Sequence, residues 1–172
     1  LEDPLEEMQR RLVAAMIYYE VTSEEISGRL FLDAGRDLNM IFVKQDRDGI
    51  SVNDEMLDYM ISKVTKNQIG LIMIDPWVGA NMISENDNIA MNAAVGAVRG
   101  VCDVTDCASN LSHHIRKTNG EDATIDSVRG AGSLVGAARA ARVITKTGRV
   151  GARKPRHIPH RRRKGKHGSA SS

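Results

Sequence analysis

The chain has 172 residues, the size of one domain, and it is 41% hydrophobic but only 3% aromatic, which predicts an aliphatic core rich in methionine. It shows no signal-peptide pattern and no apolar stretch of the roughly 18 residues that a membrane span requires, and Cys102 and Cys107 match neither a disulfide framework nor a zinc site. We therefore expect a cytoplasmic protein without a membrane partner, whose net charge of +2 is divided between an acidic body and a basic tail.

A helix is predicted from the N-terminus to Tyr19, because Asp3 can cap it and Pro4 suits its first position. A short second helix is predicted from Thr22 to about residue 28, since Glu25 completes a capping-box pattern. The next expected elements are two strands, at 30–33 and 41–43, and a turn at 46–49.

A third helix is predicted after Asn53, which can cap it, with an apolar face that extends to Val64. Residues 70–74 then form an unbroken apolar run that ends at Asp75. Such a run is typical of a strand that is buried on both faces of a parallel sheet. An alanine-rich fourth helix is expected over 87–104.

A weaker strand is predicted at 107–112, a helix at 127–139 and a last strand at 141–145. Strands that alternate with helices predict an α/β fold with a mostly parallel sheet flanked by helices. Residues 147–172 contain nine Lys and Arg and no acidic residue, whereas residues 1–146 contain 15 basic and 22 acidic residues. We therefore predict a folded domain over 1–146 and a disordered basic tail over 147–172, because the tail has no apolar periodicity.

Asp75 follows the apolar run directly. An acidic residue at the carboxyl end of an apolar strand is how a Walker B site is built, because this end of the strand opens into the crevice where α/β proteins bind ligands. A carboxylate there can hold the Mg²⁺ ion of a nucleotide, usually through water. The alternative is that Asp75 and Pro76 end a strand in an ordinary turn.

Further candidates follow along the chain. His113 and His114 end the next predicted strand, so they would lie beside Asp75 if the two strands were neighbours, and a donor there could sense a γ-phosphate. Arg139 and Arg142 follow a glycine-rich segment, and the planar guanidinium group suits a phosphoryl group in its transition state. The alternatives are an exposed histidine pair at a strand end and arginines on a helix surface.

Four segments taken together resemble a known family. They are LEDPLEEMQRRL, GRLFLDAGRDL, GLIMIDPWVGANMISENDN and LSHHIRKTNGEDATIDSVRGAGSLVGAARAARVI. Their order and spacing over about residues 1–145 resemble the RecA-like AAA-family ATPases related to the plasmid replicative helicase RepA. The resemblance implies a partial RecA-like P-loop NTPase core that binds ATP and Mg²⁺, assembles into a homo-oligomeric ring and works on DNA.

The resemblance also implies a role for each candidate. Glu2 falls at the glutamate that activates the attacking water, although an acidic residue near a helix N-terminus is also favoured by the helix dipole. Asp75 falls at the Walker B aspartate, and His114, with His113 beside it, falls at the histidine that reads the γ-phosphate. Arg139 falls at the arginine finger, which reaches the nucleotide of the next subunit, and Arg142 is a second candidate for that role.

The sequence departs from the family pattern at three places. It contains no Walker A motif, GxxxxGK[ST], which in the family lies before LEDP, so we expect a chain that lacks the first strand, the phosphate loop and its helix. Asn110 stands where the family has a buried aliphatic residue, which would cost on the order of 1–3 kcal/mol if the amide were unpaired. The resemblance also ends near Thr147, where the basic tail begins.

Two functions from different classes remain open. The first is an ATPase core of a RepA-like protein, which we expect to be inactive without its phosphate loop. The second is a non-catalytic nucleic-acid-binding protein that acts through the basic residues of its tail, such as Arg161, Arg162, Arg163 and Lys164. The tail contains no aromatic residue on which a base could stack, which argues against specific binding of single strands.

Overall fold

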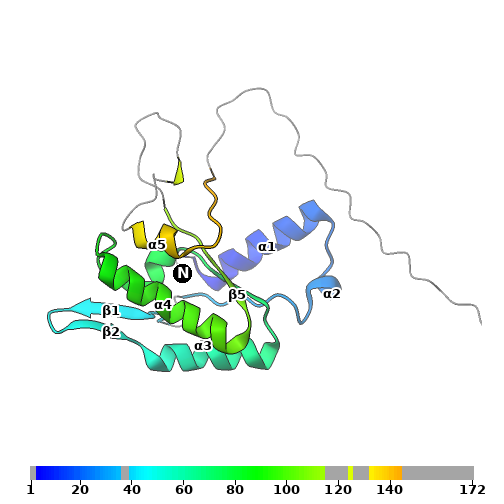
Figure 1. The fold of residues 1–172 in the computed structure, drawn as a ribbon. Coiled ribbons are helices and arrows are strands. Elements are labelled where there is room, and N and C mark those ends of the chain that lie inside the picture. The colour runs from blue at the N-terminus through cyan, green and yellow to red at the C-terminus, as the bar shows by residue number, and fades with distance from the viewer. Residues whose placement is uncertain (1–2, 36–38, 115–123, 126–131, 145–172) are drawn as a thin grey trace, which may run out of the picture.

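The computed structural model describes residues 3–35, 39–114, 124–125 and 132–144, in which helices and short strands alternate (Figure 1). The helices are α1 (Leu5–Tyr19), α2 (Ser23–Ile26), α3 (Asp54–Asn67), the 3-10 helix η1 (Trp77–Ala80), α4 (Asn88–Thr105) and α5 (Gly132–Ala137). The strands are β1 (Val43–Asp46), β2 (Gly49–Val52), β3 (Leu71–Ile74), β4 (Asn81–Met82) and β5 (Ala108–Leu111). None of the described helices combines the length and the apolar content that crossing a membrane requires.

The described strands form two small sheets. In the first, β1 lies between β2, to which it is antiparallel, and β4, to which it is parallel. The expected turn joins β1 to β2: Asp46 accepts a hydrogen bond from the Asp48 N–H at 2.9 Å, and Gly49 has a φ of 127°, which favours glycine. In the second sheet β3 and β5 are parallel, with Ile74 opposite Leu111. The expected α/β fold class is confirmed, and it is consistent with part of a RecA-like core.

Helix α4 connects the two sheets, because it contacts β1 and β2 of the first, β5 of the second, and the helices α3 and α5. Its buried alanines allow close packing, and α3 and α4 lie side by side in Figure 1. The core is aliphatic and rich in methionine, as its composition predicts. It consists of Met40, Phe42, Val43, Met56, Met60, Val64, Ile72, Ile74, Trp77, Ala80, Met91, Ala94, Ala97, Val98 and Val101.

Two of the three predicted helix caps are confirmed. Thr22 forms the expected capping box at the start of α2, and the Asn53 side chain accepts a hydrogen bond from the backbone of α3. The predicted cap of α1 is wrong, because Pro4 occupies the cap position and makes no side-chain hydrogen bond. The Asp3 carboxylate instead accepts a hydrogen bond from Arg11 Nη1 at 2.7 Å, so an ion pair along the helix replaces the cap.

Strand β3 is buried on one face only, so the expectation of burial on both faces is wrong. Ile72 and Ile74 belong to the core, whereas Leu71 is 52% exposed and Met73 is 71% exposed. Asn110 on the neighbouring strand is also exposed, so the expected cost of burying its amide does not arise. The described helices cover only one face of this sheet, which explains both corrections.

Two predicted strands are not formed in the described chain, since residues 30–33 and 141–144 have no regular secondary structure. The predicted strand at 41–43 is shifted to β1, and the predicted helix at 127–139 is described only over α5 and the residues that follow it. The sequence patterns also give no indication of β2, β4 and η1. Every residue of β2 is exposed and β4 has two residues, so neither strand has an alternation of apolar and polar side chains to detect.

Candidate functional site

The backbone of Ser112 brackets Asp75. The Ser112 N–H donates to the Ile74 carbonyl at 2.9 Å, and the Ser112 carbonyl accepts from the Trp77 N–H at 2.7 Å. The two residues between these hydrogen bonds, Asp75 and Pro76, are joined by a cis peptide bond. Since His113 follows Ser112 directly, the carboxyl ends of two adjacent parallel strands carry the aspartate and the histidine pair. Because β3 and β5 pair, the condition for placing the histidines beside Asp75 is met.

Trp77 anchors this edge of the sheet in the core. Its side chain is fully buried, its ring stacks on Phe42 with 6.4 Å between the centroids, and its Nε1–H donates to the Met91 sulfur at 3.4 Å. The sequence motifs assign no role to this residue, although the only tryptophan of the chain stands two positions after Asp75. Because Trp77 is held on several sides, the position of the Asp75 backbone is fixed as well.

The candidate side chains at this edge differ in exposure. Asp75 and His114 are exposed, and His113 is half-buried. Within the described residues, no three His, Cys, Asp or Glu side chains gather into a metal-binding group. A single exposed carboxylate therefore fits a Mg²⁺ ion that keeps water and phosphate oxygens as its other ligands, which is how this ion is usually held at nucleotide sites.

The candidate arginines follow helix α5, which packs against the rest of the domain, but they do not contact Asp75. The Ser133 N–H donates to the Asn88 side chain at the start of α4 at 3.4 Å, and Leu134 packs against the core. Arg139 and Arg142 follow α5; both are exposed, and neither makes an ion pair within the described part of the chain. Their guanidinium groups therefore face outward, where a second molecule could meet them.

Glu2, the predicted water-activating residue, lies outside the described residues, as does the segment 115–123 that follows the histidines. The first described residue next to Glu2 is Asp3, which is held against α1 by Arg11. The basic tail over 147–172 also lies outside the described residues, so the predicted domain boundary near 146 stays a prediction.

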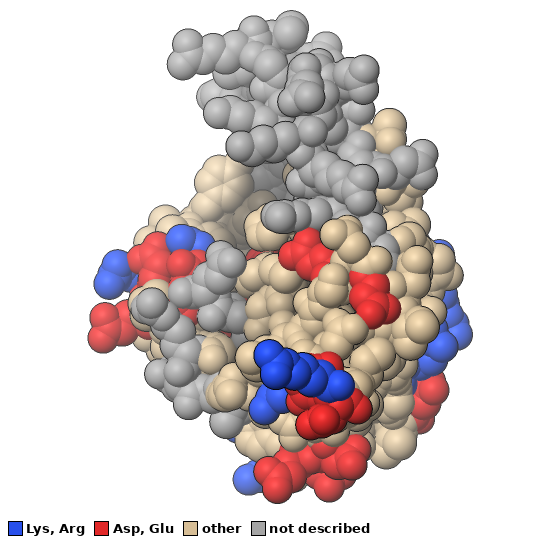
Figure 2. Space-filling view, turned by 90° about the vertical axis from the view of Figure 1, so that its left-hand side faces the viewer, with Lys and Arg blue, Asp and Glu red and all other residues tan. Residues whose placement is uncertain are grey.

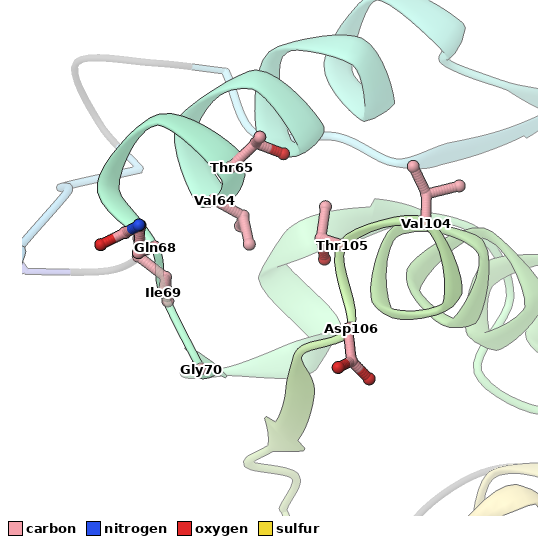
Figure 3. A pocket seen from close by; sticks show the side chains of 8 residues that line it. All are labelled: Val64, Thr65, Gln68, Ile69, Gly70, Val104, Thr105 and Asp106. Carbon is pink, nitrogen blue, oxygen red and sulfur yellow. The ribbon is translucent and has the colours of Figure 1, made fainter.

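A hollow of about 380 Å³ lies at the other end of the β3–β5 sheet (Figure 3). It is formed where α3 and α4 end and where the two parallel strands begin. Its lining residues are Val64, Thr65, Gln68, Ile69, Gly70, Val104, Thr105 and Asp106. Because α/β proteins bind nucleotides at the carboxyl ends of their strands, we assign the candidate site to the edge with Asp75 and not to this hollow.

The described geometry is that of an α/β domain with an aspartate and a histidine pair at one edge of a parallel sheet. A family model described as AAA domain matches residues 1–120, which is more than two thirds of the chain. The chain therefore belongs to the AAA domain family, a family of AAA-type P-loop ATPases. No curated protein and no solved structure matches the chain.

Proposed function

We propose that this chain forms part of the ATP-hydrolysing site of an AAA-type ATPase, with Asp75 and the histidine pair at the Mg²⁺ ion and the γ-phosphate. The pair of hydrogen bonds that Ser112 makes on either side of Asp75 carries the proposal. These bonds fix the backbone next to Asp75, His113 and His114 at one edge of the sheet before any ligand binds. Such preorganisation is what electrostatic stabilisation of a phosphoryl group requires.

Each candidate has a distinct role in the proposed site. Asp75 orients the water ligands of the Mg²⁺ ion, which supplies charge neutralisation for the phosphates when it is bound. His114, with His113 beside it, donates a hydrogen bond to a γ-phosphate oxygen, and Glu2 accepts a proton from the attacking water. Arg139, or Arg142 near it, reaches the nucleotide of a neighbouring subunit in a ring, as its exposure in the single chain allows.

The proposed site also needs a phosphate-binding loop. The 172 residues contain no GxxxxGK[ST] segment, and the amides and the lysine of such a loop provide much of the affinity for a triphosphate. We therefore propose that the chain by itself binds ATP weakly and does not hydrolyse it. Joining it to the strand, loop and helix of a AAA relative should restore both properties.

The experiment compares the chain with this loop-restored fusion. A fluorescent ATP analogue is titrated with Mg²⁺ into each protein, with energy transfer from Trp77, the only tryptophan of the chain, as the signal. In the fusion, Glu2→Gln should lower turnover by a factor on the order of 10² to 10⁴ with binding nearly unchanged, since a general base acts mainly in the transition state. Asp75→Asn should lower turnover as well, whereas Asp103→Asn, an exposed acid on α4, should not.

Two outcomes would contradict the proposal. The first is Mg²⁺-dependent binding of ATP by the unmodified chain at micromolar concentrations. The second is a fusion in which Asp75→Asn or Glu2→Gln hydrolyses ATP at the parental rate.

A second candidate function is binding of nucleic acid through the tail, and the charge distribution favours it. Nine Lys and Arg lie in 147–172 without an acidic residue. In Figure 2, by contrast, the described Lys and Arg on the face shown are scattered among Asp and Glu and do not gather into a basic patch. A RepA-like helicase role would place DNA at the same tail or at other surfaces of a ring.

Fluorescence anisotropy with single-stranded DNA tests the tail. Tail binding predicts an affinity that falls steeply with salt and a salt slope that becomes shallower when Arg161, Arg162, Arg163 and Lys164 are replaced by glutamine. An unchanged slope would exclude these residues as the phosphate contacts.

A further inference from the structure

The two cysteines of the chain lie at one helix end. Helix α4 ends in a residue with left-handed backbone, Asp106, whose φ is 55°, and the Cys107 N–H donates back to the Cys102 carbonyl at 3.3 Å. This backbone hydrogen bond is the 6→1 bond of a Schellman motif, in which the side chains of the first and last residues frequently make contact. The Cys107 thiol accordingly lies close enough to Cys102 to raise the pKa of the Cys102 thiol.

The same 6→1 hydrogen bond ends two other helices, but between residues of different chemistry. At the end of α3 the Ile69 N–H donates to the Val64 carbonyl at 3.0 Å, and at the end of α1 the Val21 N–H donates to the Met16 carbonyl at 2.9 Å. The residues joined at these two helix ends carry hydrocarbon or thioether side chains, which cannot form a disulfide. The end of α4 has two thiols in the same places, so it can form a covalent bond that the other ends cannot.

Both thiols are packed without being sealed off from solvent. Cys102 and Cys107 are half-buried and touch the core. Thr105 lines the hollow shown in Figure 3, and its hydroxyl oxygen lies 3.1 Å from the Cys107 sulfur. Cys107 therefore lies behind Thr105 at the edge of this hollow.

We propose that Cys102 and Cys107 form a dithiol site that closes reversibly to an intramolecular disulfide when it meets a small disulfide oxidant such as glutathione disulfide. One cysteine thiolate attacks the oxidant, which forms a mixed disulfide and releases one glutathione thiolate. The second cysteine thiolate then attacks the protein sulfur of the mixed disulfide and releases the second glutathione thiolate. The two cysteine protons end on the two glutathione molecules, so the protein is oxidised by two electrons and the oxidant is reduced by two.

The proposed disulfide would also constrain the chain on either side of it. It would tie the last turn of α4 to the residue before β5, the strand that leads to the histidine pair. The backbone hydrogen bond between the two cysteines already holds their main chains together, as the short Cα separation of a disulfide, about 4.4–6.8 Å, requires. We therefore expect closure to change the side-chain rotamers and to leave the helix in place.

The chemical environment sets the conditions for the reaction. Burial raises the pKa of the Cys102 thiol, the Ser109 side chain lowers it, and the neighbouring Cys107 and the Asp103 carboxylate raise it. The thiolate is the reactive form, so the site should react slowly at neutral pH and faster as the pH rises. We therefore expect slow oxidation at this site rather than rapid signalling.

The test incubates the reduced 172-residue chain with glutathione disulfide under native conditions, followed by acid quenching and intact-mass measurement. The expected product has lost two hydrogen atoms and carries no glutathione, whereas Cys102→Ser and Cys107→Ser should each retain one glutathione on the remaining cysteine. Phenylarsine oxide, which bridges adjacent thiols, should bind the parent chain and neither variant. Retention of the far-ultraviolet spectrum and of the Trp77 emission shows that each variant is folded.

A second measurement needs only the parent chain. In a glutathione redox buffer, the ratio of disulfide to dithiol should be about ten-fold or more higher in the folded chain than in urea, because folding raises the effective concentration of one thiol at the other. A stable glutathione adduct on the parent chain, disulfide-linked dimers as the main product, or equal ratios with and without urea would each overturn the proposal.

Discussion

The Trp77 N–H donates to the Ser112 carbonyl oxygen at 2.7 Å, which joins the segment after β3 to the segment after β5. Trp77 is fully buried, so this bond fastens the carboxyl edge of the parallel sheet to the core. Asp75 precedes Trp77 by two residues and His113 follows Ser112, which means that this backbone bond helps to fix the distance between the two candidate residues. The proposed ATPase site depends on this bond for its geometry, since the side chains themselves are exposed or half-buried.

The proposed arginine finger makes a prediction about neighbouring subunits. In the loop-restored fusion, Arg139→Ala should lower ATP hydrolysis by a factor on the order of 10³ or more, because a finger stabilises the charge of the transition state. Mixing this variant with Glu2→Gln subunits should recover part of the activity if the finger acts across the subunit boundary. Steady-state phosphate release from mixtures of defined ratio measures this recovery.

Arg142→Ala distinguishes between the two candidates for the finger, since Arg142 is also exposed and lies three residues further along the chain. The assignment of Arg139 fails if Arg142→Ala shows the larger loss. Trans action fails if no mixture exceeds the weighted sum of the two separate proteins.

The cap of α3 makes a prediction about stability. The Asn53 side chain accepts from the Met56 N–H at 3.3 Å and donates to the Ile41 carbonyl at 2.9 Å, so it fixes the helix to the chain before β1. Asn53→Ala should lower the free energy of unfolding by about 1–2 kcal/mol, the upper part of the range for a lost cap. Urea unfolding followed by Trp77 fluorescence provides the measurement.

Asn67→Ala, at the other end of the same helix, controls for the loss of an asparagine side chain. Its amide only donates to the Lys63 carbonyl of the preceding turn, so the change should stay within about 0.5 kcal/mol. Equal losses in the two variants would show that Asn53 does not act as a cap.

The caps and the site edge illustrate what the sequence predicts well. Thr22 and Asn53 cap their helices through neighbours within three residues, so local sequence is sufficient to identify them. The placement of Asp75 and His113 at one edge could be predicted on the condition that their strands are neighbours, because the carboxyl ends of parallel strands open onto the same side of an α/β sheet. Both predictions depend on short-range patterns or on a topological rule.

The other features depend on contacts that local sequence does not contain. Asp3 is a plausible cap by its position, but Arg11, eight residues further along, binds its carboxylate. The apolar residues of β3 suggest burial on two faces, yet only a partner surface can provide burial, and the described helices cover one face. The contact between Cys102 and Cys107 depends on the left-handed residue at Asp106, which is not a glycine and so provides no signal in the sequence.

The acid at the start of α4 predicts a pH dependence of stability. The pKa of Asp87 is lowered by the Ala90 N–H, by the Gln45 side chain, which donates at 2.6 Å, and by the Ile89 N–H. Because the folded state favours the carboxylate, this contribution to stability is present above the ordinary pKa of 3.8 and is lost as the pH falls through the lower pKa of the folded chain.

Asp87→Asn keeps an oxygen that can accept from the helix N–H groups but removes the charge. The stability difference between the parent chain and this variant should therefore be largest at neutral pH and should vanish in acid. Asp87→Ala removes the acceptor as well, so its deficit should persist at low pH. Thermal unfolding at several pH values measures both series. A difference between the parent chain and Asp87→Asn that grows on acidification would contradict the expected sign.

The one-sided burial of β3 makes the last prediction, which compares two consecutive residues. Ile72 is 8% exposed and Met73 is 71% exposed, so they face opposite sides of the same strand. Ile72→Ala should lower the free energy of unfolding by about 2–5 kcal/mol, as a buried aliphatic truncation does, whereas Met73→Ala should change it by about 0.5 kcal/mol or less. Because Met73 and Leu71 leave an apolar face uncovered, Met73→Lys should also slow aggregation of the folded chain, which light scattering at equal protein concentration would detect. Similar losses of stability for Ile72→Ala and Met73→Ala would mean that both faces of β3 are covered in solution, and the same conclusion would follow if Met73→Lys unfolded the protein.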